Sequence, residues 1–166
     1  MIYVMGGAVY VPGNVGGKDP EIKNTAAEWN MYIDPYSAGV VFASGAPVTL
    51  IPLDATNQVP VTPDFYGRLK EDRITPEAHF FFDILTQRLD SINTGQYFFW
   101  DQLAAAVVID ESLAIIEEIS IKVVESEGDE SGRTTPDDYN GSRIRVCVSV
   151  ESTRFQNLIL TGLNGR

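Results

Sequence analysis

The stretch DPYSAGVVFASGAPVTLIPLD, residues 34–54, decides the fold that we expect for this chain. Asp34 is a good helix N-cap, a proline follows it, and Gly45 is a good terminator, so the spacing predicts a helix over residues 35–44. The apolar run at residues 47–53 has the length and composition of a buried strand. A helix that leads directly into a buried strand is typical of proteins in which helices cover a β-sheet.

The pattern extends toward the N-terminus as a strand, a loop and a short helix. Apolar runs at residues 2–4 and 8–11 are interrupted by two glycines, which predicts a strand that feeds a loop continuing over residues 12–18. The sequence TAAE at residues 25–28 matches a capping box, so a short helix is expected to begin there with Glu28 reaching back to cap it.

The C-terminal two thirds of the chain repeat the alternation of helices and strands. The elements expected there are helices over residues 62–71, 75–90, 101–109 and 152–163, strands over 115–124 and 143–150, an aromatic loop over 97–100, and an acidic loop between the two strands. The sequence therefore predicts an α/β fold with a largely parallel sheet, in a single domain spanning residues 1–166.

Composition and charge exclude several classes of protein. The chain has 166 residues, of which 44% are hydrophobic, and no apolar run approaches the roughly 18 residues of a membrane span. Its net charge of −11, from 12 basic and 23 acidic residues, argues against nucleic acid and anionic membranes as partners. The N-terminal residues lack the features of a signal peptide, so a cytoplasmic location is expected.

The chain has a single cysteine, Cys147, so it cannot form an internal disulfide. Cys147 is expected to be a small core residue.

Three motifs in register resemble a known family. MGGAVYVPGN (5–14), AEWNMYIDP (27–35) and WDQLAAAVVIDE (100–111) together resemble the C-terminal half of the inosine-uridine-type nucleoside hydrolases. The strand PVTLIPLDATNQV (47–59) and the C-terminal tail also fit, so the resemblance covers essentially the whole chain. The resemblance implies the C-terminal portion of an open, mostly parallel sheet with flanking helices. It also implies hydrolysis of the N-glycosidic bond of ribonucleosides, with a bound calcium ion.

Four residues match the sugar pocket of that family. Asn14 and Glu28 match residues that hold the ribose 5′-hydroxyl, Asn30 matches one that holds the 2′/3′-diol, and Met5 matches a methionine that lines the pocket. Asparagine and glutamate suit this task because sugar hydroxyls both donate and accept hydrogen bonds. The residues by themselves also allow a turn asparagine at Asn14, a helix-capping glutamate at Glu28 and core packing at Met5.

The Trp100-Asp101 pair carries the inferences about the metal and the base. Asp101 matches the aspartate that ligates calcium and touches the ribose hydroxyls, although it could also be a plain helix N-cap. Other members carry histidine immediately before this aspartate, whereas tryptophan resembles the purine-specific branch, in which an indole stacks on the base. Trp29 favours the same branch. The alternative is that Trp100 forms a hydrophobic cluster with the aromatic residues before it. The only histidine, His79, is expected to be a surface or core residue rather than an acid.

The family's N-terminal signature is absent from these 166 residues. DxDxGxDD supplies two calcium aspartates and the aspartate that activates the attacking water, and no such string occurs here. We therefore expect no catalytic residue in this chain, an incomplete Ca²⁺ site and no activity without a complementing N-terminal half. We therefore expect the chain to be a truncated gene product, a split subunit or a C-terminal half. The expected substrate is a ribonucleoside, and homo-oligomers are a further possibility. The alternative is a non-catalytic nucleoside- or ribose-binding module, or an inactive relic.

Overall fold

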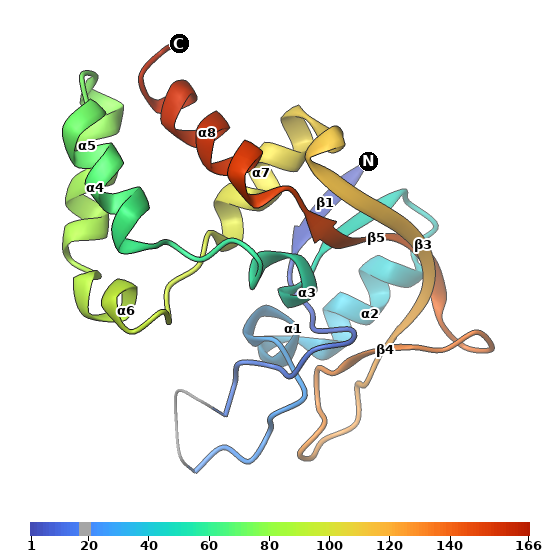
Figure 1. Cartoon of the computed structure of the whole chain (residues 1–166). Coiled ribbons are helices and arrows are strands. Elements are labelled where there is room, and N and C mark those ends of the chain that lie inside the picture. The colour runs from blue at the N-terminus through green and yellow to red at the C-terminus, as the bar shows by residue number, and fades with distance from the viewer. Residues whose placement is uncertain (17–20) are drawn as a thin grey trace. The chain divides into compact units, whose positions relative to one another are not determined.

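The computed structural model describes residues 1–16 and 21–166, which divide into two compact units (Figure 1). Unit 1 comprises residues 1–55 and 114–149, and unit 2 comprises residues 56–113 and 150–166. The expected loop over residues 12–18 is confirmed as far as residue 16, and its last two residues lie outside the described part of the chain.

Unit 1 is built on a mixed five-stranded sheet. Its strands are β1 (Ile2–Met5), β2 (Val48–Ile51), β3 (Ala114–Val123), β4 (Thr134–Pro136) and β5 (Ser142–Val150), in the order β1-β2-β5-β3-β4. The β1–β2 and β2–β5 pairs are parallel, and the β3–β4 pair is antiparallel. The α/β class is therefore confirmed. The segment between β3 and β5, which was expected to be an acidic loop, is not entirely a loop, because part of it pairs with β3 to form β4.

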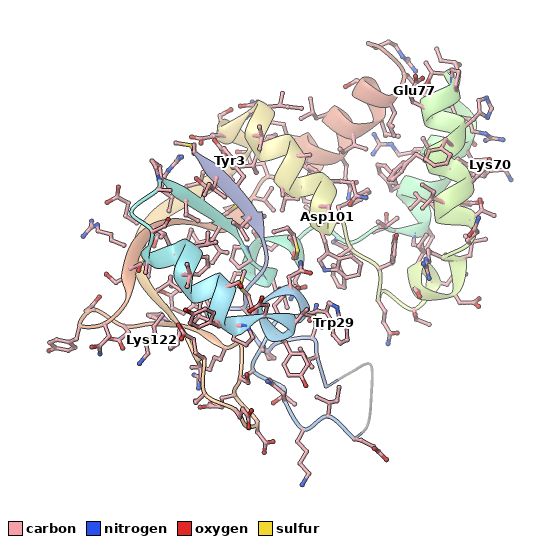
Figure 2. All side chains as sticks on the ribbon, turned by 180° about the vertical axis from the view of Figure 1, so that it is seen from behind. Tyr3, Trp29, Lys70, Glu77, Asp101 and Lys122 are labelled. Carbon is pink, nitrogen blue, oxygen red and sulfur yellow. The ribbon has the colours of Figure 1, made fainter. Side chains whose placement is uncertain are left out.

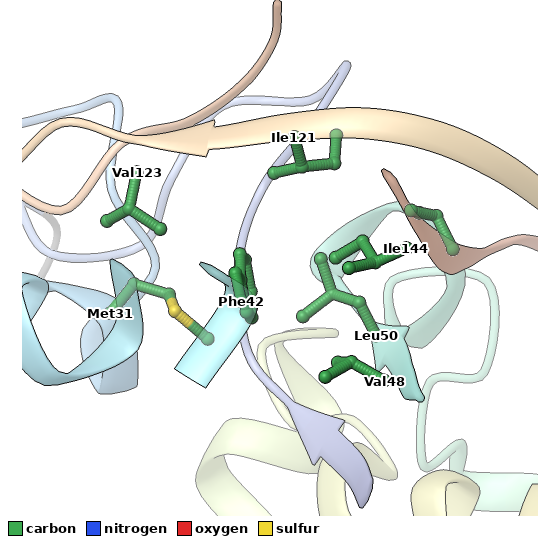
Figure 3. Close-up of a cluster of buried hydrophobic side chains, with 8 residues drawn as sticks. Met31, Phe42, Val48, Leu50, Ile121, Val123 and Ile144 are labelled. Carbon is green, nitrogen blue, oxygen red and sulfur yellow. The ribbon is translucent and has the colours of Figure 1, made fainter. Parts of the chain in front are cut away.

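Two helices, α1 (Trp29–Ile33) and α2 (Pro35–Ala43), accompany this sheet. Asp34 caps α2 by accepting from the Ser37 N–H, and α2 packs against β3. One cluster of buried hydrophobic side chains, most of which Figure 3 labels, consists of Met31, Phe42, Val48, Leu50, Ile121, Val123, Ile144 and Val146. Burial of such side chains is worth roughly 1.5–3 kcal/mol each, so this cluster stabilises unit 1.

The strand and loop expected at the N-terminus are confirmed: β1 covers Ile2–Met5, and the second apolar run, residues 8–11, lies in the loop after it. The chain turns at Gly7, whose φ of 83° is a left-handed conformation that favours glycine. The prediction for the short helix was wrong in detail. The short helix begins at Trp29 rather than at residue 25, and Glu28 is its N-cap. The Glu28 carboxylate points forward to the N–H groups of Asn30 and Met31, so no capping box forms.

Unit 2 is helical. Its elements are α4 (Pro63–Asp72), α5 (Pro76–Thr86), α6 (Leu89–Asn93), α7 (Trp100–Ile109), the 3₁₀ turn η1 (Glu111–Leu113) and α8 (Ser152–Leu163), while α3 (Leu53–Thr56) crosses from unit 1. Thr62 and Thr75 cap α4 and α5, as their positions before prolines predict. The helix expected over residues 75–90 is interrupted after Thr86. None of the helices in residues 1–16 and 21–166 has the length and apolar character needed to cross a membrane.

Two single-residue expectations are confirmed. Cys147 is fully buried in β5, and burial raises the pKa of its thiol to about 11. His79 is exposed on α5. Cys147 is therefore inaccessible as a nucleophile, and His79 is a surface residue.

Candidate functional site

The candidate site in unit 1 lies where β1 and β2 end. These strands are parallel, so their carboxyl ends meet at one edge of the sheet, where ligands gather in open α/β folds. Backbone hydrogen bonds tie the loop after β1 to this edge: the Gly6 N–H donates to the Ile51 carbonyl (3.2 Å), and the Leu53 N–H donates to the Gly7 carbonyl (2.8 Å). The loop is therefore anchored on both sides of Gly7.

Glu28 is the organising carboxylate of this site. The residue is only 2% exposed. Its Oε2 accepts hydrogen bonds from three backbone N–H groups, those of Gly7 (3.1 Å), Asn30 (2.9 Å) and Met31 (3.3 Å). Two of these donors belong to the first turn of α1 and the third to the loop after β1. One oxygen thus joins the helix N-terminus to the loop and holds the carboxylate in a single orientation.

The other three predicted sugar-pocket residues lie beside Glu28. Asn14 Oδ1 accepts from the Trp29 N–H (2.9 Å), and the Asn14 N–H donates to the Ala27 carbonyl (3.0 Å). Asn30 Nδ2 donates to the Met5 carbonyl (3.2 Å) and lies 3.5 Å from the Met5 sulfur. The structure therefore brings Met5, Asn14, Glu28 and Asn30 together in unit 1.

A close backbone approach makes this arrangement possible. A Cβ atom on Gly13 would lie 2.0 Å from the Ala27 carbonyl oxygen, so only glycine fits there. The Gly13 N–H donates to the Thr25 carbonyl at 2.8 Å. The segment before α1 consequently packs directly on the loop that carries Asn14.

Three buried polar residues that the sequence analysis did not single out support the site. Asp54 accepts from the Val9 and Tyr10 N–H groups, both at 2.8 Å. Thr134 binds the backbone of Ala8, and Asn24 Oδ1 accepts from the Ala26 and Ala27 N–H groups. An aspartate that directly follows a buried strand is a signal that could have pointed to Asp54. Thr134 lies 126 residues from its partner, so no local pattern could have found it.

Trp100 and Asp101 form the second group of candidates, at the start of α7 in unit 2. Trp100 is half-buried, and its ring meets Tyr97 edge-on, with centroids 5.5 Å apart, and Phe98 at 5.8 Å. Its indole Nε1 is buried and has no hydrogen-bond partner in residues 1–16 and 21–166. Phe99 points elsewhere, packing edge-on against Phe65 in the core of unit 2. Trp100 therefore forms an aromatic cluster with Tyr97 and Phe98, and Phe99 is not part of it.

The backbone before α7 explains how Trp100 is presented. The Val61 N–H donates to the Tyr97 carbonyl (2.8 Å), and the Phe99 N–H donates to the Val59 carbonyl (3.1 Å). This short antiparallel contact holds the aromatic segment until α7 begins at Trp100, and Phe99 occupies the N-cap position. Asp101 therefore lies in the first turn and is not the N-cap.

Asp101 is exposed on α7, where Figure 2 labels it. Its carboxylate forms no hydrogen bond or ion pair within the described part of the chain. Calcium takes six to eight oxygen ligands. No group of three or more acidic, histidine or cysteine residues within residues 1–16 and 21–166 is arranged to hold a metal ion.

Comparisons with known proteins agree with these motifs. Residues 1–157 match the family described as inosine-uridine preferring nucleoside hydrolase. The solved structure of an inosine-uridine preferring nucleoside hydrolase from Bacillus anthracis superposes on this chain with a TM-score of 0.79 and 32% sequence identity. The match covers 97% of this chain and 50% of the Bacillus anthracis chain. For a purine-preferring ribonucleoside hydrolase from Gardnerella vaginalis, the identity is 31% and the TM-score 0.74, covering 97% of this chain and 51% of that one.

A relative with a different base preference is also similar. The pyrimidine-specific ribonucleoside hydrolase RihB of Escherichia coli O157:H7 is 29% identical over 95% of this chain and 50% of its own length. The chain thus spans about half the length of the relatives that it matches. Because the family match extends over nearly all of its residues, the chain belongs to the inosine-uridine preferring nucleoside hydrolase family.

Proposed function

We propose that this chain supplies the ribose-binding and base-stacking part of a ribonucleoside hydrolase that prefers purine nucleosides. The observation that carries the proposal is the convergence of Asn14, Glu28 and Asn30 at the carboxyl ends of two parallel strands. Such an edge is the usual ligand position in open α/β sheets, and these three side chains offer the donors and acceptors that a sugar needs.

The hydrogen bonds already formed leave other side-chain atoms available for the proposed sugar contacts. Asn14 uses Oδ1 for the Trp29 N–H, and its Nδ2 has no partner within residues 1–16 and 21–166, so it can donate to the ribose 5′-oxygen. Asn30 uses Nδ2 for Met5, and its Oδ1 has no partner among the same residues, so it can accept from the 2′/3′-diol. Glu28 joins Asn14 at the 5′-hydroxyl, and Met5 forms an apolar wall.

The purine preference rests on Trp100. Its indole lies in an aromatic group with Tyr97 and Phe98, which suits stacking on a flat base. A bicyclic purine overlaps more of an indole than a pyrimidine does. Stacking holds the base and favours its protonation by solvent as the bond between ribose and base breaks. The relatives include both purine-preferring and pyrimidine-specific enzymes, so membership of the family does not by itself assign the base.

Asp101 is proposed as one carboxylate ligand of a calcium ion. Its exposed carboxylate has no competing partner in the described part of the chain, and calcium prefers such oxygens. The remaining ligands and the general base that activates water are proposed to come from a DxDxGxDD-containing segment, which these 166 residues do not include. A non-catalytic nucleoside-binding module is the second candidate, because no metal-binding group forms within residues 1–16 and 21–166.

Calorimetric titration of the purified chain with inosine and with ribose tests the proposal. We expect both to bind, and Asn30→Ala to weaken both about three- to tenfold, because one or two hydrogen bonds to the diol are lost. His79→Ala, an exposed change on α5, serves as the matched control and is expected to bind like the wild type. Equal affinities for Asn30→Ala and wild type would remove Asn30 from the sugar site, and no binding at all would contradict the proposal.

A further inference from the structure

The β3–β4 hairpin, residues 124–134, contacts the backbone around the candidate sugar site. Its strongest contact is the Thr134 hydroxyl, which accepts from the Ala8 N–H (2.8 Å) and donates to the Ala8 carbonyl (3.1 Å). Thr134 is 1% exposed and Ala8 is 3% exposed. One buried hydroxyl therefore satisfies both polar backbone groups of Ala8, which have no access to water.

Ala8 is adjacent to the residue that orients Glu28. The Gly7 N–H donates to Glu28 Oε2 at 3.1 Å. Gly7 is left-handed, and a Cβ atom there would lie 3.0 Å from the Thr134 hydroxyl oxygen, so this hydroxyl packs directly on Gly7. A displacement of Ala8 would therefore turn the Gly7 N–H away from the carboxylate.

The same hairpin supports the side of the site that carries Asn14. The Ser131 carbonyl accepts from Asn24 Nδ2 at 2.7 Å, and Asn24 Oδ1 accepts from the Ala27 N–H at 2.9 Å. The Ala27 carbonyl in turn accepts from the Asn14 N–H. Asn24 is 2% exposed and Ser131 is half-buried, so this link is less buried than that of Thr134.

We propose that Thr134 is a positioning residue of the sugar site: by holding Gly7 and Ala8, it aims the Gly7 N–H at Glu28 and fixes the carboxylate for the ribose 5′-hydroxyl. The role in sugar binding rests on the function proposed above. Thr134 itself does not touch the sugar. Its effect passes through two backbone residues and one hydrogen bond.

Amide hydrogen exchange measured by NMR on the ligand-free chain tests the positioning directly. Thr134→Val keeps the shape of the side chain and removes both hydrogen bonds, so exchange at Gly7 and Ala8 should accelerate about tenfold or more. Thr134→Ser retains the hydroxyl and should restore protection. Thr135→Val, one residue along the same strand, is the matched control and should leave both amides unchanged. The Leu50 amide in β2 reports global unfolding, and in Thr134→Val its exchange should accelerate less than the exchange at Gly7 and Ala8.

Titration with inosine gives the second readout. Thr134→Val should weaken inosine binding about three- to tenfold, and Thr134→Ser should bind like the wild type. Unchanged exchange at Gly7 and Ala8 in Thr134→Val would overturn the proposal, as would equal acceleration at Leu50, because the role would then be general stability. If the wild type binds no inosine, the proposed function of the chain fails, while the positioning of Glu28 is still decided by the exchange at Gly7 and Ala8.

Discussion

At Glu28, one carboxylate oxygen joins two parts of the chain that are separated by 21 residues. It caps α1 through Asn30 and Met31, and it holds the loop after β1 through Gly7. The sequence permits a capping role and a ligand role, which do not exclude one another. The structure shows that the cap uses Oε2 and that the residue lies beside Asn14 and Asn30. The capping role is therefore compatible with the proposed role at the 5′-hydroxyl, because the cap is what orients the carboxylate.

Replacing Trp100 with alanine tests the proposed purine preference. In a hydrolase assembled from this chain and a matching DxDxGxDD-containing half, we expect inosine turnover to fall several-fold while uridine turnover changes little. The reason is that aromatic stacking is worth about 0.5–1.5 kcal/mol beyond area burial, and 1.4 kcal/mol is about a factor of ten. Steady-state kcat/KM for the two nucleosides measures the difference. Equal losses for both would mean that the indole only packs the pocket wall.

The thiol of Cys147 should be unreactive in the native chain. Burial raises its pKa from 9.0 to about 11, so at pH 8 nearly all of it is the un-ionised thiol. Because the folded-state pKa is raised, this group contributes stability that is fully present below pH 9 and is lost as the pH rises toward 11. Labelling with a chromogenic disulfide reagent at pH 8 should be slow in buffer and rapid in denaturant. Rapid labelling of the native chain would contradict the buried position.

At the scale of elements, the β3–β4 hairpin shows why an acidic, glycine-containing segment is ordered in this structure. Gly132 lies against the backbone of α1, where an added Cβ would be 2.6 Å from the Tyr32 Cα atom. The Gly132 N–H also donates to the Val124 carbonyl at 2.8 Å. Together with the contacts of Thr134 and Ser131, this close approach makes the hairpin a support for the site.

Gly132→Ala should destabilise the chain more than Gly45→Ala, although both glycines have a left-handed backbone conformation. Gly132 has a φ of 82° and a backbone neighbour in contact, whereas Gly45 has a φ of 75° and open space within 4 Å. Gly45→Ala therefore carries only the left-handed strain, about 1 kcal/mol, and Gly132→Ala adds a backbone clash of roughly 1–3 kcal/mol. Urea unfolding of both variants measures the difference. Equal losses of stability would show that the hairpin does not press on α1.

At the scale of the whole molecule, the candidate residues are divided between the two compact units. Met5, Asn14, Glu28 and Asn30 belong to unit 1, and Trp100 and Asp101 belong to unit 2. Within each unit, the local structure that presents these side chains is complete. The chain spans about half the length of its relatives, and within residues 1–16 and 21–166 no cluster of metal ligands forms. The proposed sugar binding and the proposed hydrolysis can therefore be tested by separate experiments.

The purified 166-residue chain should release no ribose from inosine, even with excess calcium. It offers Asp101 as one carboxylate ligand, whereas calcium takes six to eight oxygens, and it lacks the DxDxGxDD string that would supply the water-activating aspartate. A reducing-sugar assay with and without calcium measures this, with a complete relative as positive control. Calcium-dependent turnover that Asp101→Ala abolishes would contradict the prediction.

The sequence by itself determined the α/β class, most element positions and the family, because these depend on local patterns. Asp34 with a following proline, the threonines before α4 and α5, and the apolar run of β2 act through neighbours in the chain. The motifs around Asn14, Glu28 and Trp100 carry the family resemblance in the same local way.

Only the tertiary structure decided how the candidate sugar site is held. The Glu28 cap also binds the Gly7 N–H, 21 residues away, and the β3–β4 hairpin is held by Ala8 and packs on the backbone of α1. β4 itself exists because Thr134–Pro136 pair with β3 across a turn that the composition marks as a loop. Such contacts join residues up to 126 positions apart, so their energies appear only when the chain has folded and leave no periodic signal in the sequence.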